Sequence, residues 1–172
     1  MKKLFGVLGK VFIDAFRVDD PPRNPYPQTV AECLDDNLKY KSGTEEAIKD
    51  FRMMNPYRGS PEEKQVKFRM LNTALAKVYE IDEPRLVFVD RFPAGPCCFP
   101  TSKPAVIMME PSGDGDYSVV AFLHEFAHTL GKGEKGACTW SLNLFKRYWP
   151  KSFEKLEPRG HMLYKKKKAT ST

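Results

Sequence analysis

Two histidines and a glutamate lie close together in residues 119–130. His124, Glu125 and His128 form the pattern His-Glu-x-x-His. On a helix that advances about 100° per residue, the two histidines lie about 40° apart and one turn from each other, with Glu125 about 60° to the side of His128. Zinc-dependent hydrolysis uses this arrangement, in which two imidazoles bind the metal and a glutamate acts as general base.

The residues around this pattern predict an amphipathic helix. Apolar side chains would fall on the arc opposite the histidines, at Val120, Leu123, Phe126, Ala127 and Leu130. The alternative interpretation is that both histidines are ordinary surface or core residues of a helix. The helical context, and the presence of only one other histidine in the chain, favour the metal site.

A catalytic zinc takes three protein ligands and keeps one position for water. Glu134 follows His128 by six residues, across Gly131 and Gly133. These glycines let the chain turn back, so that the next helix can lie against the first and bring Glu134 to the histidines. Glu134 is therefore the favoured third ligand. Two alternatives stay open: Glu134 is merely an acid in the first turn of a helix, or the remaining histidine, His161, is the ligand.

The elements that must position these residues are predicted from capping patterns and periodicity. Three capping patterns, near residues 29, 42 and 60, predict helices that extend to about Tyr40, Met54 and Tyr79. The β-rich runs 85–90 and 105–110 predict strands. Asp116 is the expected N-cap of the helix that carries the histidines, and a further helix over residues 137–149 is expected to stop at Pro150.

The net charge of +6 is concentrated near the C-terminal end of the sequence. Residues 145–172 carry nine Lys or Arg and two acidic residues, whereas the rest of the chain has a net charge of −1. No aromatic or base-reading pattern accompanies the lysines. We therefore expect a solvated basic tail over residues 151–172, and nucleic acid is not an expected partner.

The first 27 residues are expected to lie outside the folded domain of residues 28–150. Residues 2–17 have the period of an amphipathic helix, which would pack back on the domain or dock on a protein partner or a membrane surface. A proline-rich linker follows. The initial apolar run is too short for a signal peptide, and no segment is apolar enough to span a membrane. The four cysteines lack C-x-x-C spacing, so we expect reduced thiols and a cytoplasmic location.

Over residues 61–150 the order of these motifs resembles the minimal gluzincins, which are small zinc-dependent peptidase-like domains of phage and plasmid proteins and of the ImmA/IrrE type. The matching parts are a scaffold helix, two short strands, the His-Glu-x-x-His pattern, and Glu134-x-x-Ala-x-x-Trp140 in the next helix. The resemblance implies an α+β, zincin-like fold, with helices packed on a small, mostly antiparallel sheet. It also implies one Zn²⁺ per chain, bound by His124, His128 and Glu134, with Glu125 as the base.

The resemblance further implies an exposed edge strand that aligns a peptide substrate. The matching position is the run Gly95, Pro96, Cys97, Cys98 and Phe99. Larger gluzincins also have a histidine or tyrosine that steadies the oxyanion, for which His161 and Tyr148 are the candidates.

One position departs from the pattern of these families. Four residues after the ligand glutamate they commonly carry Asp or Asn, which supports a ligand histidine, whereas this chain has Cys138. A thiol is a weaker hydrogen-bond partner, which puts the orientation of the histidine in doubt. The thiol could also bind metal or confer redox sensitivity, or it could be a small buried core residue.

Three hypotheses for function follow. The first is a zinc metalloendopeptidase acting on a peptide or protein substrate. The alternative is a catalytically weak or inactive structural or interaction protein with a zincin fold, for example a phage particle component anchored by the helix 2–17. The intact Glu125 favours the enzyme, because a structural zinc has no use for a base. A basic nucleic-acid-binding module is the third.

Overall fold

The computed structural model describes residues 26–89, 96–110 and 115–165 of the 172. The predicted helix 2–17 and most of the proline-rich linker lie outside the described residues. The elements, in chain order, are the 3₁₀-helix η1 (Ala31–Cys33), α2 (Thr44–Met53), α3 (Pro61–Tyr79), β1 (Arg85–Phe88), β2 (Cys97–Phe99), β3 (Val106–Met109), α4 (Asp116–Thr129), α5 (Glu134–Tyr148), α6 (Pro150–Lys155), β4 (Leu156–Arg159) and β5 (Met162–Lys165).

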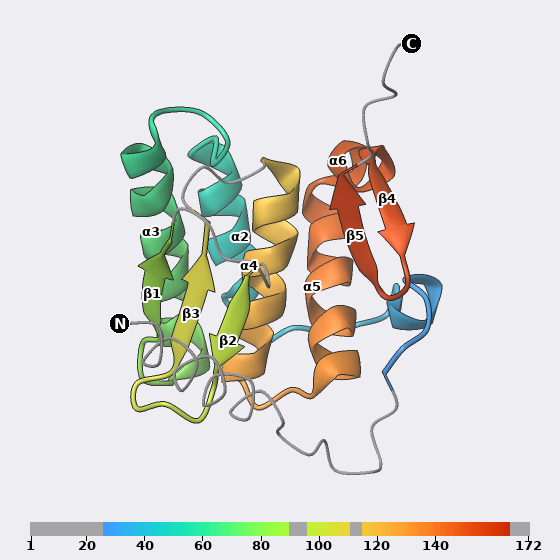
Figure 1. The fold of residues 1–172 in the computed structure, drawn as a ribbon, viewed down its shortest axis with the longest axis horizontal. Helices are drawn as coiled ribbons and strands as arrows, with labels where there is room; N and C mark the ends of the chain where they lie inside the picture. The colour runs from blue at the N-terminus through green and yellow to red at the C-terminus, as the bar shows by residue number, and fades with distance from the viewer. Residues whose placement is uncertain (1–25, 90–95, 111–114, 166–172) are drawn as a thin grey trace, which may run out of the picture.

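The fold is α+β with small, mostly antiparallel sheets, as the sequence predicts. In the three-stranded sheet β3 is central, pairing parallel with β1 and antiparallel with β2, which leaves β2 at an edge. A separate hairpin is formed by β4 and β5. Figure 1 shows the sheet and the hairpin on either side of the pair α4 and α5. Helix α4 contacts both β2 and β5, so the edge strand and the hairpin flank it.

Helix α4, which carries His124, Glu125 and His128, is buried on all sides from Ser118 to Ala127 rather than on one face, whereas His128 is partly exposed. The side chains buried between residues 119 and 127 include Val119, Val120, Ala121, Phe122, Leu123, Phe126 and Ala127. A helix that is apolar all round belongs in the centre of a domain. This burial matters for function, because it includes His124 and Glu125, whose exposed fractions are 4% and 8%.

Local sequence signals set most of the helix boundaries. Helix α3 begins as predicted, with reciprocal hydrogen bonds between Ser60 and Glu63 that form a capping box. The pattern near residue 29 gives only the short 3₁₀-helix η1 instead of a helix to Tyr40. The N-cap residues of α2 and α4 are Gly43 and Gly115, rather than the polar residues that the sequence favoured.

The chain beyond Pro150 is folded up to residue 165, so the expected tail over residues 151–172 is wrong for its first part. Pro150 occupies the first turn of α6 instead of ending the helical region. The hairpin that follows buries Leu156 and Leu163 in the same core as α4 and α5. Residues 156–165 therefore belong to the domain, and the turn of the hairpin has a fixed place in it.

We expect Leu163→Ala to lower the free energy of unfolding by about 2–5 kcal/mol, because it removes a fully buried side chain and leaves a cavity. Tyr164→Ala is the matched control on the same strand, since Tyr164 is exposed and its removal should cost far less. Chemical denaturation of both variants measures the difference. Equal, small effects would mean that the hairpin contributes little to the core.

Candidate metal centre

The two histidines of α4 converge as their spacing predicts. Their rings lie 4.8 Å apart at an angle of 87°, and the two Nε2 atoms approach to 3.2 Å. The chain then leaves α4 through Gly131, whose φ of 73° is in the left-handed region that glycine adopts without strain. This turn brings the start of α5 back against α4, which places Glu134 beside both rings.

Glu134 contacts both histidines through its carboxylate. Its Oε1 lies 3.2 Å from Nε2 of His124, and its Oε2 lies 3.5 Å from Nε2 of His128. Ligand atoms bound to a tetrahedral zinc at about 2.0–2.2 Å lie roughly 3.3–3.5 Å from one another. The three separations between His124, His128 and Glu134 therefore fit the edges of a zinc site, and two imidazoles with one carboxylate are a donor set that zinc accepts.

Hydrogen bonds on the far side of each ring orient the nitrogens. Nδ1 of His128 lies 2.9 Å from the carbonyl oxygen of Lys132. Because a carbonyl only accepts, this Nδ1 carries the hydrogen, and the lone pair of a neutral His128 is then on Nε2, facing Glu134. Nδ1 of His124 lies 3.7 Å from Sγ of Cys138. Each ring thus has a partner behind it, as is usual for histidines that bind metal.

The buried carboxylate and the two imidazoles of the cluster favour a positive charge between them. Burial opposes ionisation of Glu134, but hydrogen bonds from His124 and His128 hold the pKa of its carboxyl well below the usual range. Burial would likewise lower the pKa of His128, yet the contacts with Glu134 and with the Lys132 carbonyl raise it above 6.5. A proton between carboxylate and imidazole meets this need, and a divalent cation would meet it more fully.

Glu125 lies buried next to this cluster. Burial raises the pKa of its carboxyl to about 8, an effect that the Glu134 carboxylate increases and His128 opposes. A buried carboxyl of this kind can hold or release a proton near neutral pH. The Glu125 carboxylate also affects the thiols of β2. Burial, with a smaller contribution from the charge of Glu125, raises the pKa of Cys97 to about 11 and that of Cys98 to about 12.

The predicted substrate strand lies where a peptide could pair with it. Cys97, Cys98 and Phe99 form β2 at the edge of the sheet, antiparallel to β3 and in contact with α4. Pro96 precedes the strand in a bend, and Gly95 lies outside the described residues.

The two candidates for an oxyanion group fall in different places. His161, in the turn between β4 and β5, lies with Nε2 3.1 Å from Oε1 of Glu134, so the structure brings it to the cluster. Tyr148 is wrong for this role. It is 14 residues after Glu134 on the same helix, about 21 Å along the axis, and donates a hydrogen bond to Glu45 at 2.8 Å.

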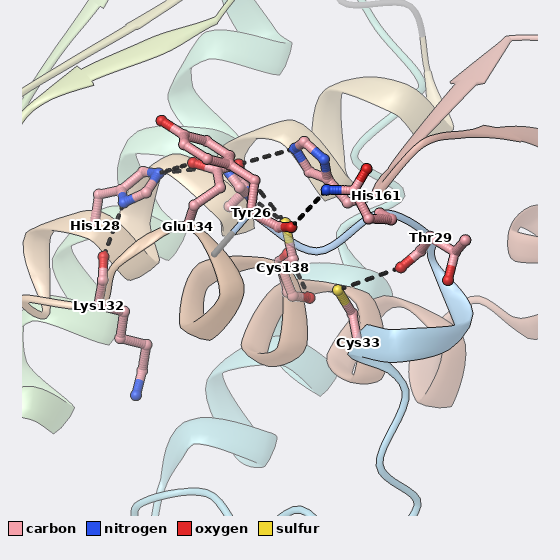
Figure 2. Close-up of polar contacts among 11 residues, drawn as sticks. Tyr26, Thr29, Cys33, His128, Lys132, Glu134, Cys138 and His161 are labelled. Carbon is pink, nitrogen blue, oxygen red and sulfur yellow. Dashed lines mark hydrogen bonds and ion pairs between the residues drawn. The ribbon is translucent and has the colours of Figure 1, made fainter. Parts of the chain in front are cut away.

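Two residues near the cluster were not predicted from the sequence. Tyr26 lies with its ring 6.1 Å from that of His161. Cys33 is buried on η1 near the thiol of Cys138, and its own thiol donates a hydrogen bond to the carbonyl oxygen of Thr29 at 3.7 Å. Both belong to the segment before α2, whose prolines and lone cysteine carry no metal-site pattern, so only the folded chain reveals their proximity (Figure 2).

A second potential ligand set shares two residues with the first. His124, Glu134 and Cys138 offer ligand atoms within 4.8 Å of one another. However, the sulfur contacts Nδ1 of His124, whereas Nε2 of that ring faces His128 and Glu134. One imidazole nitrogen binds one metal, so the set with His128 uses the better-aligned nitrogen. Cys138 then supports the ring from behind, and burial raises the pKa of its thiol, which favours the neutral form.

We expect purified wild-type protein to contain about one zinc per chain after expression with sufficient metal, and Glu134→Ala to contain much less, because the carboxylate supplies one of three ligands. Mass spectrometry of metal content measures both. Glu154→Ala, at an exposed glutamate of α6, is the matched control and should keep its zinc. An unchanged zinc content in Glu134→Ala would remove Glu134 from the ligand set.

The two ligand sets make opposite predictions for His128 and Cys138. If the first set holds, His128→Ala should lose the metal, while Cys138→Ser should keep about one zinc with an affinity at most about 100-fold lower, as for a residue that only orients a ligand. Titration against a chromophoric chelator gives both affinities. The reverse order, with Cys138→Ser losing the metal and His128→Ala retaining it, would establish the sulfur-containing set.

None of the helices that the structure describes is long and apolar enough to cross a membrane. No protein-family model, curated protein or solved structure matches the chain. The geometry of the cluster around Glu134 is therefore the basis on which a function is assigned.

Proposed function

We propose that the protein is a zinc-dependent metalloendopeptidase with a zincin-like fold of the gluzincin type. The observation that carries the proposal is the convergence of His124, His128 and Glu134 with the separations of tetrahedral zinc ligands. The order of elements supports it, since a sheet with an edge strand precedes α4, and α5 supplies the third ligand.

Each residue of the cluster has a role in this reaction. His124, His128 and Glu134 would hold the zinc, and the bound metal would act as a Lewis acid that lowers the pKa of a water molecule. Lys132 and Cys138 orient the two rings through their Nδ1 atoms. Glu125 takes a proton from the attacking water on its carboxylate and delivers it to the nitrogen of the leaving amine.

The proposed substrate is an extended peptide. Strand β2 is an edge strand in contact with α4, and Glu125 is near enough to influence the thiols of Cys97 and Cys98. A peptide that paired with β2 would add a strand to the sheet and bring its backbone carbonyls past the proton-transfer residue. Backbone pairing of this kind depends little on side chains, which suits an endopeptidase.

One observation favours the alternative, a structural or interaction protein with the same fold, for example a phage particle component. His161 lies with its Nε2 3.1 Å from Oε1 of Glu134, where it could supply a fourth ligand, and closed zinc sites with four protein ligands are structural. Against this stands Glu125, because a buried carboxyl that binds no metal has no purpose in a structural site.

We expect Glu125→Gln to lower the rate of peptide cleavage by at least about 100-fold and to leave the zinc content at about one per chain. The amide cannot accept the proton but keeps the shape of the side chain. Cleavage of a mixed peptide library, followed by mass spectrometry, is the assay. Glu154→Gln is the control. Zinc-loaded wild type that cleaves no peptide would favour the structural alternative.

A further inference from the structure

All three histidines of the chain meet at one carboxylate. His124 and His128 come from α4, whereas His161 comes from the turn between β4 and β5, and each approaches Glu134 within 3.5 Å. Figure 2 shows Glu134 between His128 and His161. Since the three histidines lie on two separate elements and face a helix that supplies the acid, their meeting is a property of the whole fold.

The hairpin holds His161 in this place. Gly160, the first residue of the two-residue turn, has a φ of 59°, which glycine adopts readily in tight hairpin turns. Leu156 and Leu163 anchor the two strands in the core, and β5 contacts α4. The imidazole is only partly exposed, at 26% of its side-chain surface. Its position is therefore built into the domain.

We propose that His161 is a fourth protein ligand, which closes the zinc site in the resting protein. The inference rests on the proposed metal centre and adds a regulation to it. The separation of 3.1 Å between Nε2 of His161 and Oε1 of Glu134 is close to a tetrahedral edge, so one metal can serve both atoms. A substrate or water then gains the fourth position only by displacing the imidazole of His161.

The competing explanation is that His161 only donates a hydrogen bond to Glu134. Carboxylate ligands are commonly held by such bonds, and a distance of 3.1 Å suits one. The two roles differ in what can replace the histidine. Glutamine keeps an N–H donor but is a poor zinc ligand, whereas cysteine is a good zinc ligand but a weak donor.

The test compares zinc affinity in wild type, His161→Ala, His161→Gln and His161→Cys by chelator competition, with Arg159→Gln as the matched control. Arg159 pairs with Glu157 on the exposed side of the same hairpin. We expect the Ala and Gln variants to lose at least about 100-fold in affinity, more than loss of a supporting hydrogen bond costs. Cysteine should restore most of the loss, and the control should match wild type.

Cobalt(II) substitution gives a readout that is independent of affinity and of activity. His161→Cys should add a thiolate-to-cobalt absorption in the near ultraviolet that wild type lacks, because the new sulfur reaches the metal. A simple hydroxamate should change the visible spectrum of cobalt-loaded His161→Ala much more than that of wild type, since only the variant has an open position. Circular dichroism of the metal-free variants checks that each is folded.

The failure of this inference is distinguishable from the failure of the proposed function. If wild type binds zinc and hydroxamate freely perturbs its cobalt spectrum, His161 is not a ligand and the peptidase proposal stands. If His161→Gln keeps wild-type affinity and His161→Cys gains no new absorption, the hydrogen-bond role is correct and the inference is overturned. If wild type binds no zinc or cobalt, both proposals fall.

Discussion

The structure depends on one electrostatic constraint, which is that the carboxylate of Glu134 lies among imidazole nitrogens in a largely buried place. Its oxygens lie 3.2 Å from Nε2 of His124 and 3.5 Å from Nε2 of His128, and they accept a hydrogen bond from the thiol of Cys138 at 3.7 Å. Nδ1 of His128 is already committed to the carbonyl of Lys132. A neutral His128 then turns the lone pair of its Nε2 towards the Glu134 carboxylate, so a proton or a metal ion between the two groups stabilises the cluster.

The packing of α4 and α5 fixes where the side chains of this cluster lie. The burial of residues 118–127 of α4 on every side fixes the rotation of the helix, and with it the direction of both histidine rings, more firmly than a surface helix could. The packing of α5 along α4 then fixes the depth of Glu134, which is the first residue of its helix. Aromatic packing between Phe126 on α4 and Trp140 on α5, with ring centroids 6.2 Å apart, joins the two helices on the side away from the site.

The parts of this arrangement that the sequence predicts are those that depend on neighbours along the chain. The spacing of His124 and His128, the glycine turn before Glu134 and the cap at Ser60 each involve a few residues, so their geometry follows from helix and turn stereochemistry. The strands predicted from composition at 85–90 and 105–110 agree with β1 and β3, and the edge strand that the resemblance implies at 95–99 agrees with β2.

The parts that the sequence does not predict depend on long-range packing. The β4–β5 hairpin has two four-residue strands in a lysine-rich stretch, one of them containing Pro158, and nothing local shows that Leu163 reaches the core. Its fold decides where His161 lies. Tyr148 shows the converse case. It shares α5 with Glu134, but it lies at the C-terminal end of the helix and its hydroxyl donates to Glu45.

The contacts of Cys138 depend both on its local spacing along α5 and on the packing of α5 against α4. Its position four residues after Glu134 places it one turn along α5, so that it faces both Glu134 and His124, at 3.7 Å from each. A carboxylate there would add negative charge next to Glu134 and bind the ring of His124 strongly, whereas a neutral thiol holds the ring weakly and adds no charge. In the proposed zinc site, a weaker hydrogen bond to His124 would lower the affinity of three ligands for the metal, and a fourth ligand from the hairpin would offset that loss. In the proposed centre, the weak partner behind His124 and the approach of His161 to Glu134 are therefore linked, because the hairpin ligand would compensate for the weaker hydrogen bond on α5.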